Sequence, residues 1–438
     1  MKKYSKKNKK NILNHKVQKG GLKVAEGSFG CVVKPNIPCR KTKKKYHHSI
    51  SKIIHTKNNN EYLEELDIYK RIRLLDPKQN YLISFLEECK LYNSDLNSRH
   101  PKDILTVSMD NSDSYSYKLT GKDTKLKELY SHDDLDKKFC KTDFDKEPRN
   151  MIQPYGGDDL SKIIKSKNTD ILKLCVKKIH KITYNLLYGI YKLHSAKIIH
   201  RDIKELNILV FLKPKPKKNY TKKKNSKDKN NNSKSNKNIN YSPIARHIDF
   251  GLSEDISKNI SRDIYDVHYQ GTPGFIPIDI VLLSKIKRYL SRKNKKYNLL
   301  KEDYKNILIK QTFNEYNRNM IKRYSKLKLN KSFINLSKNS MIGKDKNTYV
   351  TLEDISELCD KYTKSIVNNK FEDIYFKKYD GIIYKSDIFA LGLVFKQIIN
   401  VLKVKNDKLE NLVKKMCQID PDDRPNIKEC LKHPFFKI

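Results

Sequence analysis

The sequence has no apolar run long enough to cross a membrane, no cysteines spaced for zinc and no tryptophan. A membrane-spanning helix needs about 18 or more consecutive apolar residues, so we expect no spanning segment. Residues 1 to 20 are strongly basic and contain no apolar core. This composition predicts that they are not a secretion signal.

The cysteines are scattered, without a Cys-x-x-Cys pair or a Cys/His cluster. They are Cys31, Cys39, Cys89, Cys140, Cys175, Cys359, Cys417 and Cys430. Disulfides are rare in reducing compartments, and this spacing gives no sign of a disulfide framework. We therefore expect reduced thiols in an intracellular, cytoplasmic protein, with the nucleus as an alternative location.

The chain carries a formal net charge of +43, with a pI near 9.7. Such basicity favours polyanionic partners, such as nucleic acid or an anionic membrane. The abundance of Lys, Asn, Ile and Tyr favours a blander cause, an A/T-rich genome filling tolerant surface positions. No zinc spacing or aromatic-basic motif supports a nucleic-acid-binding protein. With 438 residues, the chain exceeds the roughly 250 to 300 at which one core stops growing, so we expect two lobes with insertions.

The first part of the chain predicts a basic tail followed by a small β-rich region. Residues 1–18 are rich in Lys and Asn, and we expect them to be disordered. Residues 21–33 alternate around glycines, which predicts strand, Gly-rich loop and strand. An apolar strand at 49–54 and a helix at 61–75 follow. The polar stretch of about 89–146 is predicted to be an insertion.

The second part predicts helices interrupted by two more insertions. Residues 171–194 have apolar positions at helical spacing and predict one long helix. Between Lys213 and Lys237 there are eleven lysines, so about 213–241 is predicted to be a disordered loop. It would leave a hairpin whose strands are 208–212 and 244–248.

About 283–380 differs from that loop because it has helical periodicity. It includes a capping box, in which Thr351 and Asp354 begin a helix. This pattern predicts a folded helical insertion.

The most informative segment is His200-Arg201-Asp202-Ile203-Lys204-Glu205-Leu206-Asn207, followed downstream by Asp249-Phe250-Gly251. It combines a proton acceptor, a cation and two oxygen ligands at the spacing that phosphoryl transfer requires. Asn185 to Asn207, with these downstream residues, resembles the eukaryotic-type serine/threonine protein kinase family. The Lys/Asn-rich loops and long insertions look similar to the divergent kinases of giant DNA viruses, which would place the protein in a host cell or a virion.

The resemblance implies an α+β, bilobal protein-kinase-like fold, with the N-lobe and hinge at 19–157 and the C-lobe at 158–436. It implies an ATP-dependent serine/threonine protein kinase that modifies protein substrates. Asp202 would be the proton acceptor and Lys204 would neutralise the transferring γ-phosphoryl group. The remaining implied residues are Asn207 and Asp249 as ligands of Mg²⁺, with Mn²⁺ as an alternative, and Thr272 as a bridge between Asp202 and Lys204.

The resemblance also implies a nucleotide site. Its Gly-rich loop would be formed by Val24, Ala25, Glu26, Gly27, Ser28, Phe29, Gly30, Cys31 and Val32, with Ala25 in place of the family's first glycine. Lys52 lies in an apolar strand and needs an anionic partner. By register this partner is Glu65, with Glu61 and Glu64 as rivals.

The hinge of the nucleotide site is expected around Pro154 and Gly156. Pro154 has no amide hydrogen, but the expected adenine contact there uses a carbonyl. Gly156 would supply the next N–H and C=O. Asp159 is a candidate for binding the ribose.

Three further residues implied by the family concern the large lobe. Arg201 would bind a phosphorylated activation segment. The candidate acceptors are Ser253, Ser257, Ser261, Tyr265 and Tyr269. Asp387 would hold the backbone of the catalytic loop. Asp279 stands where the family has a glutamate paired with Arg424, and we expect its shorter side chain to loosen that pair.

The main alternative is a pseudokinase-type scaffold, which would bind a partner through the helical insertion and the basic surface. Lys52, Asp202, Asn207 and Asp249 are all present, and this argues for an enzyme. Polyanions could also contact the basic loops, because exposed lysines attract them in a salt-dependent way.

Overall fold

The computed structural model describes residues 22–27, 30–34, 36–39, 44, 46–54, 59–90, 105–109, 115–119, 148–166, 168–214, 241–258, 267, 269–293, 302–326, 350–368 and 370–437. The predicted tail 1–18, and most of the predicted insertions 89–146 and 213–241, lie outside these residues. The chain divides into two compact units. Unit 1 is Met1–Gln79 with Ile83–Tyr155, and unit 2 is Asn80–Leu82 with Gly156–Ile438.

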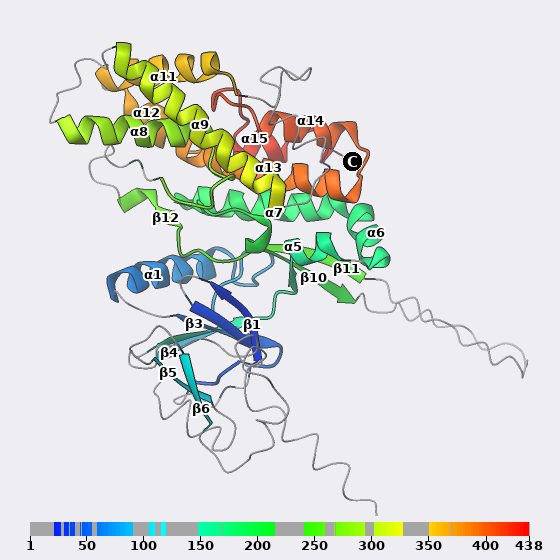
Figure 1. Cartoon of the computed structure of the whole chain (residues 1–438). Coiled ribbons are helices and arrows are strands. Elements are labelled where there is room, and N and C mark those ends of the chain that lie inside the picture. Colours follow the sequence, from blue (N-terminus) through cyan, green and yellow to red (C-terminus); the bar gives the residue numbers. More distant parts are fainter. Residues whose placement is uncertain are drawn as a thin grey trace, which may run out of the picture. The chain divides into compact units, whose positions relative to one another are not determined.

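Unit 1 contains an antiparallel sheet whose described strands follow the order β1-β2-β3-β7-β4 (Figure 1). These strands are β1 (Leu22–Gly27), β2 (Gly30–Lys34), β3 (Ser49–Ile54), β4 (Glu87–Lys90) and β7 (Arg149–Pro154). A separate hairpin pairs β5 (Leu105–Met109) with β6 (Tyr115–Leu119). The predicted strand-loop-strand and the apolar strand that follows it are therefore confirmed as β1, β2 and β3.

Unit 1 also contains the helix α1 (Asn59–Leu75). Its buried residues recur at helical spacing, as the sequence predicts, and include Tyr62, Leu66, Tyr69 and Ile72. A buried stripe of this kind fixes which side chains of the helix face the rest of the unit and which stay at its surface.

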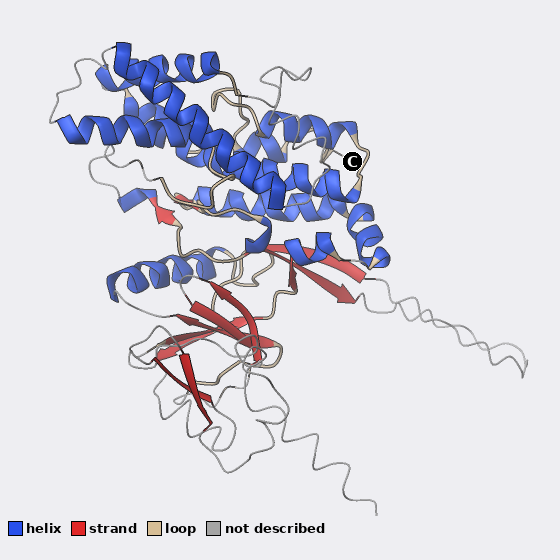
Figure 2. Ribbon diagram, in the orientation of Figure 1, coloured by secondary structure: helices blue, strands red, loops and turns tan. Residues whose placement is uncertain are grey.

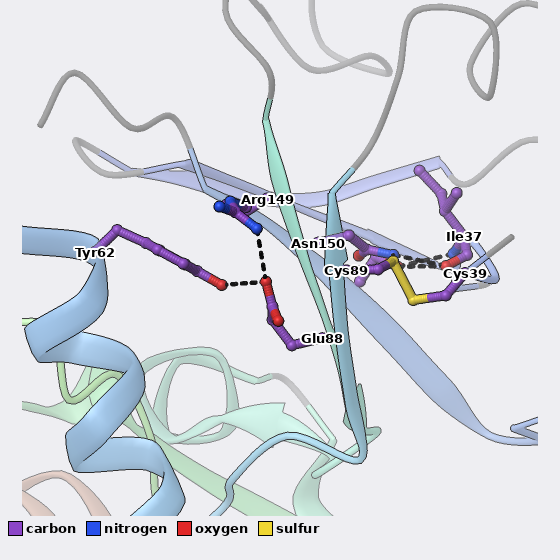
Figure 3. Close-up of a disulfide and its surroundings, with 8 residues drawn as sticks. Ile37, Cys39, Tyr62, Glu88, Cys89, Arg149 and Asn150 are labelled. Atoms are coloured by element: carbon purple, nitrogen blue, oxygen red, sulfur yellow. Dashed lines mark hydrogen bonds and ion pairs between the residues drawn. A yellow bond between two sulfur atoms is a disulfide. The ribbon is translucent and has the colours of Figure 1, made fainter. Parts of the chain in front are cut away.

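A disulfide joins Cys39, which follows β2, to Cys89 on the edge strand β4, with 5.9 Å between their Cα atoms (Figure 3). The loop before Cys39 is hydrogen-bonded to β3 and β7, the two strands that lie between β2 and β4 in the sheet. Ile37 N donates to Ser51 Oγ on β3 at 2.8 Å, and Asn150 Nδ2 on β7 donates to Ile37 O at 2.7 Å. The prediction of reduced thiols is therefore wrong for Cys39 and Cys89, because this loop brings together cysteines that are 50 positions apart. It is also wrong for Cys31, which is disulfide-bonded.

Unit 2 is mainly helical in its described residues (Figure 2). Its helices are α5 (Leu160–Lys165), α6 (Thr169–Lys177), α7 (Ile179–Ser195), α8 (Ile278–Lys293), α9 (Glu302–Lys326), α11 (Leu352–Val367), α12 (Phe371–Phe376), α13 (Ile382–Leu402), α14 (Asp407–Met416) and α15 (Ile427–Leu431). None of the described helices combines the length and apolarity needed to cross a membrane. The single helix predicted at 171–194 is wrong in one respect, because the non-helical backbone of Lys178 separates α6 from α7.

Short strands connect the helices of unit 2. The predicted hairpin is confirmed, since β10 (Ile208–Pro214) pairs with β11 (Tyr241–His247). A second antiparallel pair joins β9 (Ile198–Ile199) to β12 (Glu254–Asp255). The functional loop 200–207 lies between β9 and β10, so both of its ends are anchored in hydrogen-bonded strands.

The core of unit 2 is built around α13, whose side chains are buried on nearly all sides. Such a helix has no solvent face and is typical of the centre of a large helical body. The predicted helical insertion contributes α9, α11 and α12, and α12 packs against α13. The predicted capping box is confirmed, because Thr351 Oγ1 accepts from Asp354 N and Asp354 Oδ2 accepts from Thr351 N.

Candidate active site

The carboxylate of Asp202 is the centre of a hydrogen-bonded cluster in unit 2. Its Oδ1 accepts from Thr272 Oγ1 at 2.6 Å. Its Oδ2 accepts from Lys204 Nζ at 2.8 Å and from Asn207 Nδ2 at 2.9 Å. Lys204 Nζ also donates to Thr272 Oγ1 at 2.8 Å. Asp202 is buried and has little contact with water, so these hydrogen bonds fix the orientation of its carboxylate.

The backbone of the loop is held by Asp387, which lies in α13. Its Oδ2 accepts from His200 N at 2.8 Å and its Oδ1 accepts from Arg201 N at 2.9 Å. His194 Nε2 lies 3.0 Å from the same carboxylate. Burial would raise the pKa of Asp387, but the hydrogen bonds from His194 and the loop backbone outweigh burial and hold that pKa below its usual range. Asp387 therefore holds the loop as expected.

Thr272 reaches Asp202 because of the glycine before it. Gly271 has φ +121°, and a Cβ there would lie 2.5 Å from the carbonyl oxygen of Arg201. Only glycine tolerates both the positive φ and this approach. The backbone of the 271–275 segment is thus packed directly against the loop that carries Asp202.

Two oxygen-bearing side chains lie at neighbouring backbone positions. Ile248 N donates to Asn207 O at 3.0 Å, so Asn207 lies beside the residue preceding Asp249. Because the Asn207 amide nitrogen donates to Asp202, its Oδ1 is the atom suited to accept a cation. An amide oxygen and a carboxylate are hard ligands of the kind that Mg²⁺ and Mn²⁺ prefer. These residues fit a divalent metal.

In unit 1, Lys52 is paired with Glu65. Lys52 Nζ lies 2.9 Å from Glu65 Oε1, and the two side chains are 12% and 9% exposed. The rival Glu64 is exposed, and the side chain of Glu61 lies outside those described. Of the three acids that the sequence left as candidates, the structure pairs Lys52 with Glu65 on α1.

The expected Gly-rich loop follows the hairpin of β1 and β2. Val24, Ala25, Glu26 and Gly27 lie on β1, and Gly30, Cys31 and Val32 lie on β2, whereas Ser28 and Phe29 lie outside the described residues. Gly27 and Gly30 face each other at the end of the hairpin. Val32 is directly opposite Lys52 on β3. The strands therefore bring this segment to the lysine.

The expected hinge residues are divided between the units. Pro154 ends β7 in unit 1, and Gly156 begins the main part of unit 2. Asp159 caps α5, since its Oδ1 accepts from Lys162 N at 2.8 Å. Its role towards a ribose stays a prediction.

Comparison with known proteins agrees with this geometry. A model of the protein kinase domain matches residues 137–436. The chain belongs to the protein kinase domain family. It is 33% identical over 60 residues to mitogen-activated protein kinase KSS1 of Saccharomyces cerevisiae, and 37% identical over 60 residues to cell division control protein 2 homolog 2 of Trypanosoma brucei brucei. Each match covers 14% of this chain and 16% of the relative.

Arg201 already has an acidic partner within the chain. Its Nη1 binds Glu254 Oε2, and its Nε donates to Leu252 O at 2.6 Å. Burial lowers the pKa of Arg201, while the charge of Glu254 opposes that shift. Sequence reasoning missed Glu254, although its position five residues after Asp249 was visible. Arg201 was expected to bind a phosphorylated residue, and that expectation is untested.

Three of the candidate phosphorylation sites have described hydrogen bonds. Ser253 Oγ donates to His200 O, Ser257 Oγ donates to Asp255 Oδ1, and Tyr269 is bonded to Glu315. Ser261 and Tyr265 lie outside the described residues.

The ion pair between Asp279 and Arg424 is intact. Arg424 Nη2 and Nη1 donate to the two carboxylate oxygens of Asp279 at 2.8 and 3.1 Å, and neither side chain is exposed. Burial alone would lower the pKa of Arg424, but the charge of Asp279 raises it instead. The expected loosening is therefore wrong, because a bidentate geometry is retained with the shorter acid.

Proposed function

We propose that this chain is an ATP-dependent serine/threonine protein kinase, which transfers the γ-phosphoryl group to a serine or threonine hydroxyl of a protein. The observation that carries the proposal is the cluster around Asp202. Its carboxylate is bonded at once to Thr272, Lys204 and Asn207, and its backbone neighbours are held by Asp387. A carboxylate held in this way can accept the proton of an attacking hydroxyl.

The residues of unit 2 divide the remaining work. Lys204 carries its charge within 2.8 Å of both Asp202 and Thr272, where it would neutralise charge on the transferring group. Asn207 and Asp249 would hold Mg²⁺, or Mn²⁺ as an alternative. When bound, the metal and its nucleotide supply the phosphoryl group and neutralise phosphate charge. Thr272 would keep the acceptor and the lysine together.

Unit 1 would contribute to nucleotide binding. Lys52 is held extended by Glu65 at 2.9 Å, an arrangement suited to binding the α- and β-phosphates. The glycines of the β1–β2 hairpin would let backbone amides approach phosphate oxygens. Pro154, Gly156 and Asp159 complete the proposed nucleotide contacts.

Specificity, partners and origin belong to the proposal as well. A lysine at the position of Lys204 is typical of serine/threonine rather than tyrosine kinases. One of the two similar relatives is named as a mitogen-activated protein kinase and the other as a cell division control protein. Contact with polyanions through the basic loops follows from the charge of +43. Kinship with giant-virus kinases and an intracellular location rest on composition, and the Cys39–Cys89 disulfide argues against a strongly reducing compartment.

A scan of phosphate transfer from radiolabelled ATP to serine, threonine and tyrosine peptides tests this function. We expect serine and threonine peptides to be labelled, and Asp202→Asn to lower the rate by on the order of 10²- to 10⁴-fold. Asp373→Asn is the matched control, because Asp373 is exposed on α12. If no peptide is labelled and ATP does not bind, the scaffold alternative replaces the enzyme.

A further inference from the structure

The inserted helix α9 touches the segment that carries Thr272. Glu315, Asn319 and Arg323 recur every four residues along α9 and so lie on one face of the helix. That face meets residues 269–275, which begin with Tyr269, the last of the candidate acceptors in the expected activation segment. A helix from an insertion thus lies against backbone that packs on the catalytic loop.

The first contact is with Tyr269. Its hydroxyl is hydrogen-bonded to Glu315 and Asn319, and Glu315 Oε2 is also 2.6 Å from Lys285 Nζ on α8. Burial and the bond to Glu315 raise the pKa of Tyr269 to about 12. A phenol is protonated at neutral pH even at its ordinary pKa of 10.0, so Tyr269 donates to Glu315. These bonds tether the start of the segment to two helices.

The second contact is with a tight turn. Phe275 N donates to Thr272 O at 3.0 Å, Pro273 is the second residue and Gly274 has φ +88°, as in a type II turn. A Cβ on Gly274 would lie 2.9 Å from Arg323 Cβ and 3.0 Å from Asn319 O. The helix therefore backs the turn so closely that only glycine fits.

The third contact is made by the side chain of Arg323, which is 7% exposed. Its guanidinium carbon lies 4.2 Å from the centre of the Phe275 ring. Its Nη2 donates to Leu393 O at 3.2 Å and to Gln397 Oε1 at 3.4 Å, both on α13. A planar, always charged group can stack on a ring and donate sideways at the same time, which lysine cannot do.

Through these contacts, α13 is connected both to the catalytic loop and to the 272–275 turn. That helix holds the catalytic loop through Asp387 and holds Arg323 through Leu393 and Gln397. Arg323 contacts Phe275, the last residue of the 272–275 turn. Thr272, the first residue of the same turn, donates to Asp202. The two segments that carry Thr272 and Asp202 are thus both held by the buried helix α13.

We propose that Arg323 is a positioning residue for phosphoryl transfer, which fixes the 272–275 turn so that Thr272 keeps Asp202 and Lys204 in place. This inference rests on the proposed kinase function. It gives the helical insertion a part in the reaction, because misplacement of reacting groups by about 1 Å can cost on the order of 10²-fold in rate.

The kinetic test compares Arg323→Met with Arg318→Met, since Arg318 is an exposed arginine on the same helix. Arg323→Met should lower kcat for a serine peptide by on the order of 10²-fold and leave KM for ATP nearly unchanged. Arg318→Met should behave as the wild type. Equal kcat for the wild type and Arg323→Met would overturn the inference.

A double-mutant cycle separates positioning from general support of the fold. Thr272→Val removes the bridging hydroxyl, so Arg323→Met should cost far less in the Thr272→Val background than in the wild type. The same loss in both backgrounds contradicts action through Thr272. If Arg323→Met does not fold, Phe275→Leu, which removes the ring under the guanidinium, takes its place in the same cycle with the same two outcomes.

A readout that needs no activity distinguishes this inference from the proposed function. Hydrogen exchange at the Phe275 amide, which is bonded to Thr272 O, should be at least about tenfold faster in Arg323→Met than in Arg318→Met. Unchanged exchange overturns the positioning role even in an active kinase. An inactive wild type with the expected exchange difference overturns the kinase function and leaves the turn's dependence on Arg323 established.

Discussion

In unit 1 the described cysteines, Cys31, Cys39 and Cys89, are disulfide-bonded, whereas those described in unit 2 are not in disulfides. The kinase family model begins at residue 137 and so covers little of unit 1, but it covers nearly all of unit 2. Both residues of the Lys52–Glu65 pair in unit 1 therefore lie outside the matched sequence. The comparison suggests that covalent links support the region whose sequence departs from the family.

Unit 2 relies on buried polar contacts instead. Asp387 binds two backbone amides of the catalytic loop, and Asp279 binds Arg424 with no exposure of either side chain. Its thiols are poor nucleophiles, because burial raises the pKa of both Cys175 and Cys417 to about 11. A reductant should therefore act on unit 1 and leave unit 2 unchanged.

The largest expected effect comes from removing the disulfide of Figure 3. Cys39 and Cys89 are 50 positions apart, and a cross-link over such a loop contributes about 4 kcal/mol by restricting the unfolded chain. The double variant Cys39→Ser, Cys89→Ser should lose about this much local stability in β4 and β7. Hydrogen exchange along the full chain measures it.

Exchange in α7 and α13 is the internal control for that experiment, and it should not change. Faster exchange in all four elements alike would show that the disulfide does not act on unit 1 selectively. Adding a reductant to the double variant should then reveal any contribution of the bonded Cys31.

A smaller effect is expected from the polar contact beside the disulfide. Tyr62 on α1 donates to Glu88 Oε1 on β4 at 2.6 Å, and Arg149 Nη1 lies 3.4 Å from the same oxygen (Figure 3). A hydrogen bond to a charged group contributes about 1.5 to 3 kcal/mol. Tyr62→Phe should destabilise α1 by this amount in a denaturant titration followed by hydrogen exchange.

Tyr191→Phe on α7 is the control for the Tyr62 variant. Since α1 carries Glu65, Tyr62→Phe should also raise KM for ATP, whereas Tyr191→Phe should not. An unchanged KM in both variants would mean that β4 has no part in placing α1.

The effect that is smallest near neutral pH is a pH dependence of unit 2. Burial lowers the pKa of His247 from 6.5 to about 3, and its Nε2 lies 2.9 Å from Leu186 O. The unfolded chain then binds a proton that the folded chain excludes. Stability is therefore full above pH 6.5 and falls by about 1.4 kcal/mol per pH unit as pH drops towards 3. His247→Gln should remove this slope, and a slope that persists would assign the proton to another group.

Spacing between residues close together in sequence predicted much of the structure. The catalytic loop, the β10–β11 hairpin and the capping box at Thr351 each depend on residues close together in sequence. The partner of Lys52 was predicted as Glu65, with Glu61 and Glu64 as rivals, from the register of the family resemblance, and the structure pairs Lys52 with Glu65. Features that depend on residues close together in sequence can therefore be predicted from the sequence.

Long-range contacts could not be predicted in the same way. The Cys39–Cys89 bond depends on how one loop crosses β3 and β7. Similarly, the Arg323 contacts depend on how the predicted insertion packs on α13, about 70 positions further along the chain. The bidentate bonding of Asp279 by Arg424 also joins residues far apart in sequence.

Single-turnover transfer of phosphate from bound ATP to a serine peptide tests the central claim most directly. Asp202→Asn should bind ATP with Mg²⁺ as the wild type does but transfer phosphate on the order of 10²- to 10⁴-fold more slowly, because only the proton acceptor is lost. Transfer by Asp202→Asn at the wild-type rate would contradict the role of the cluster around Asp202.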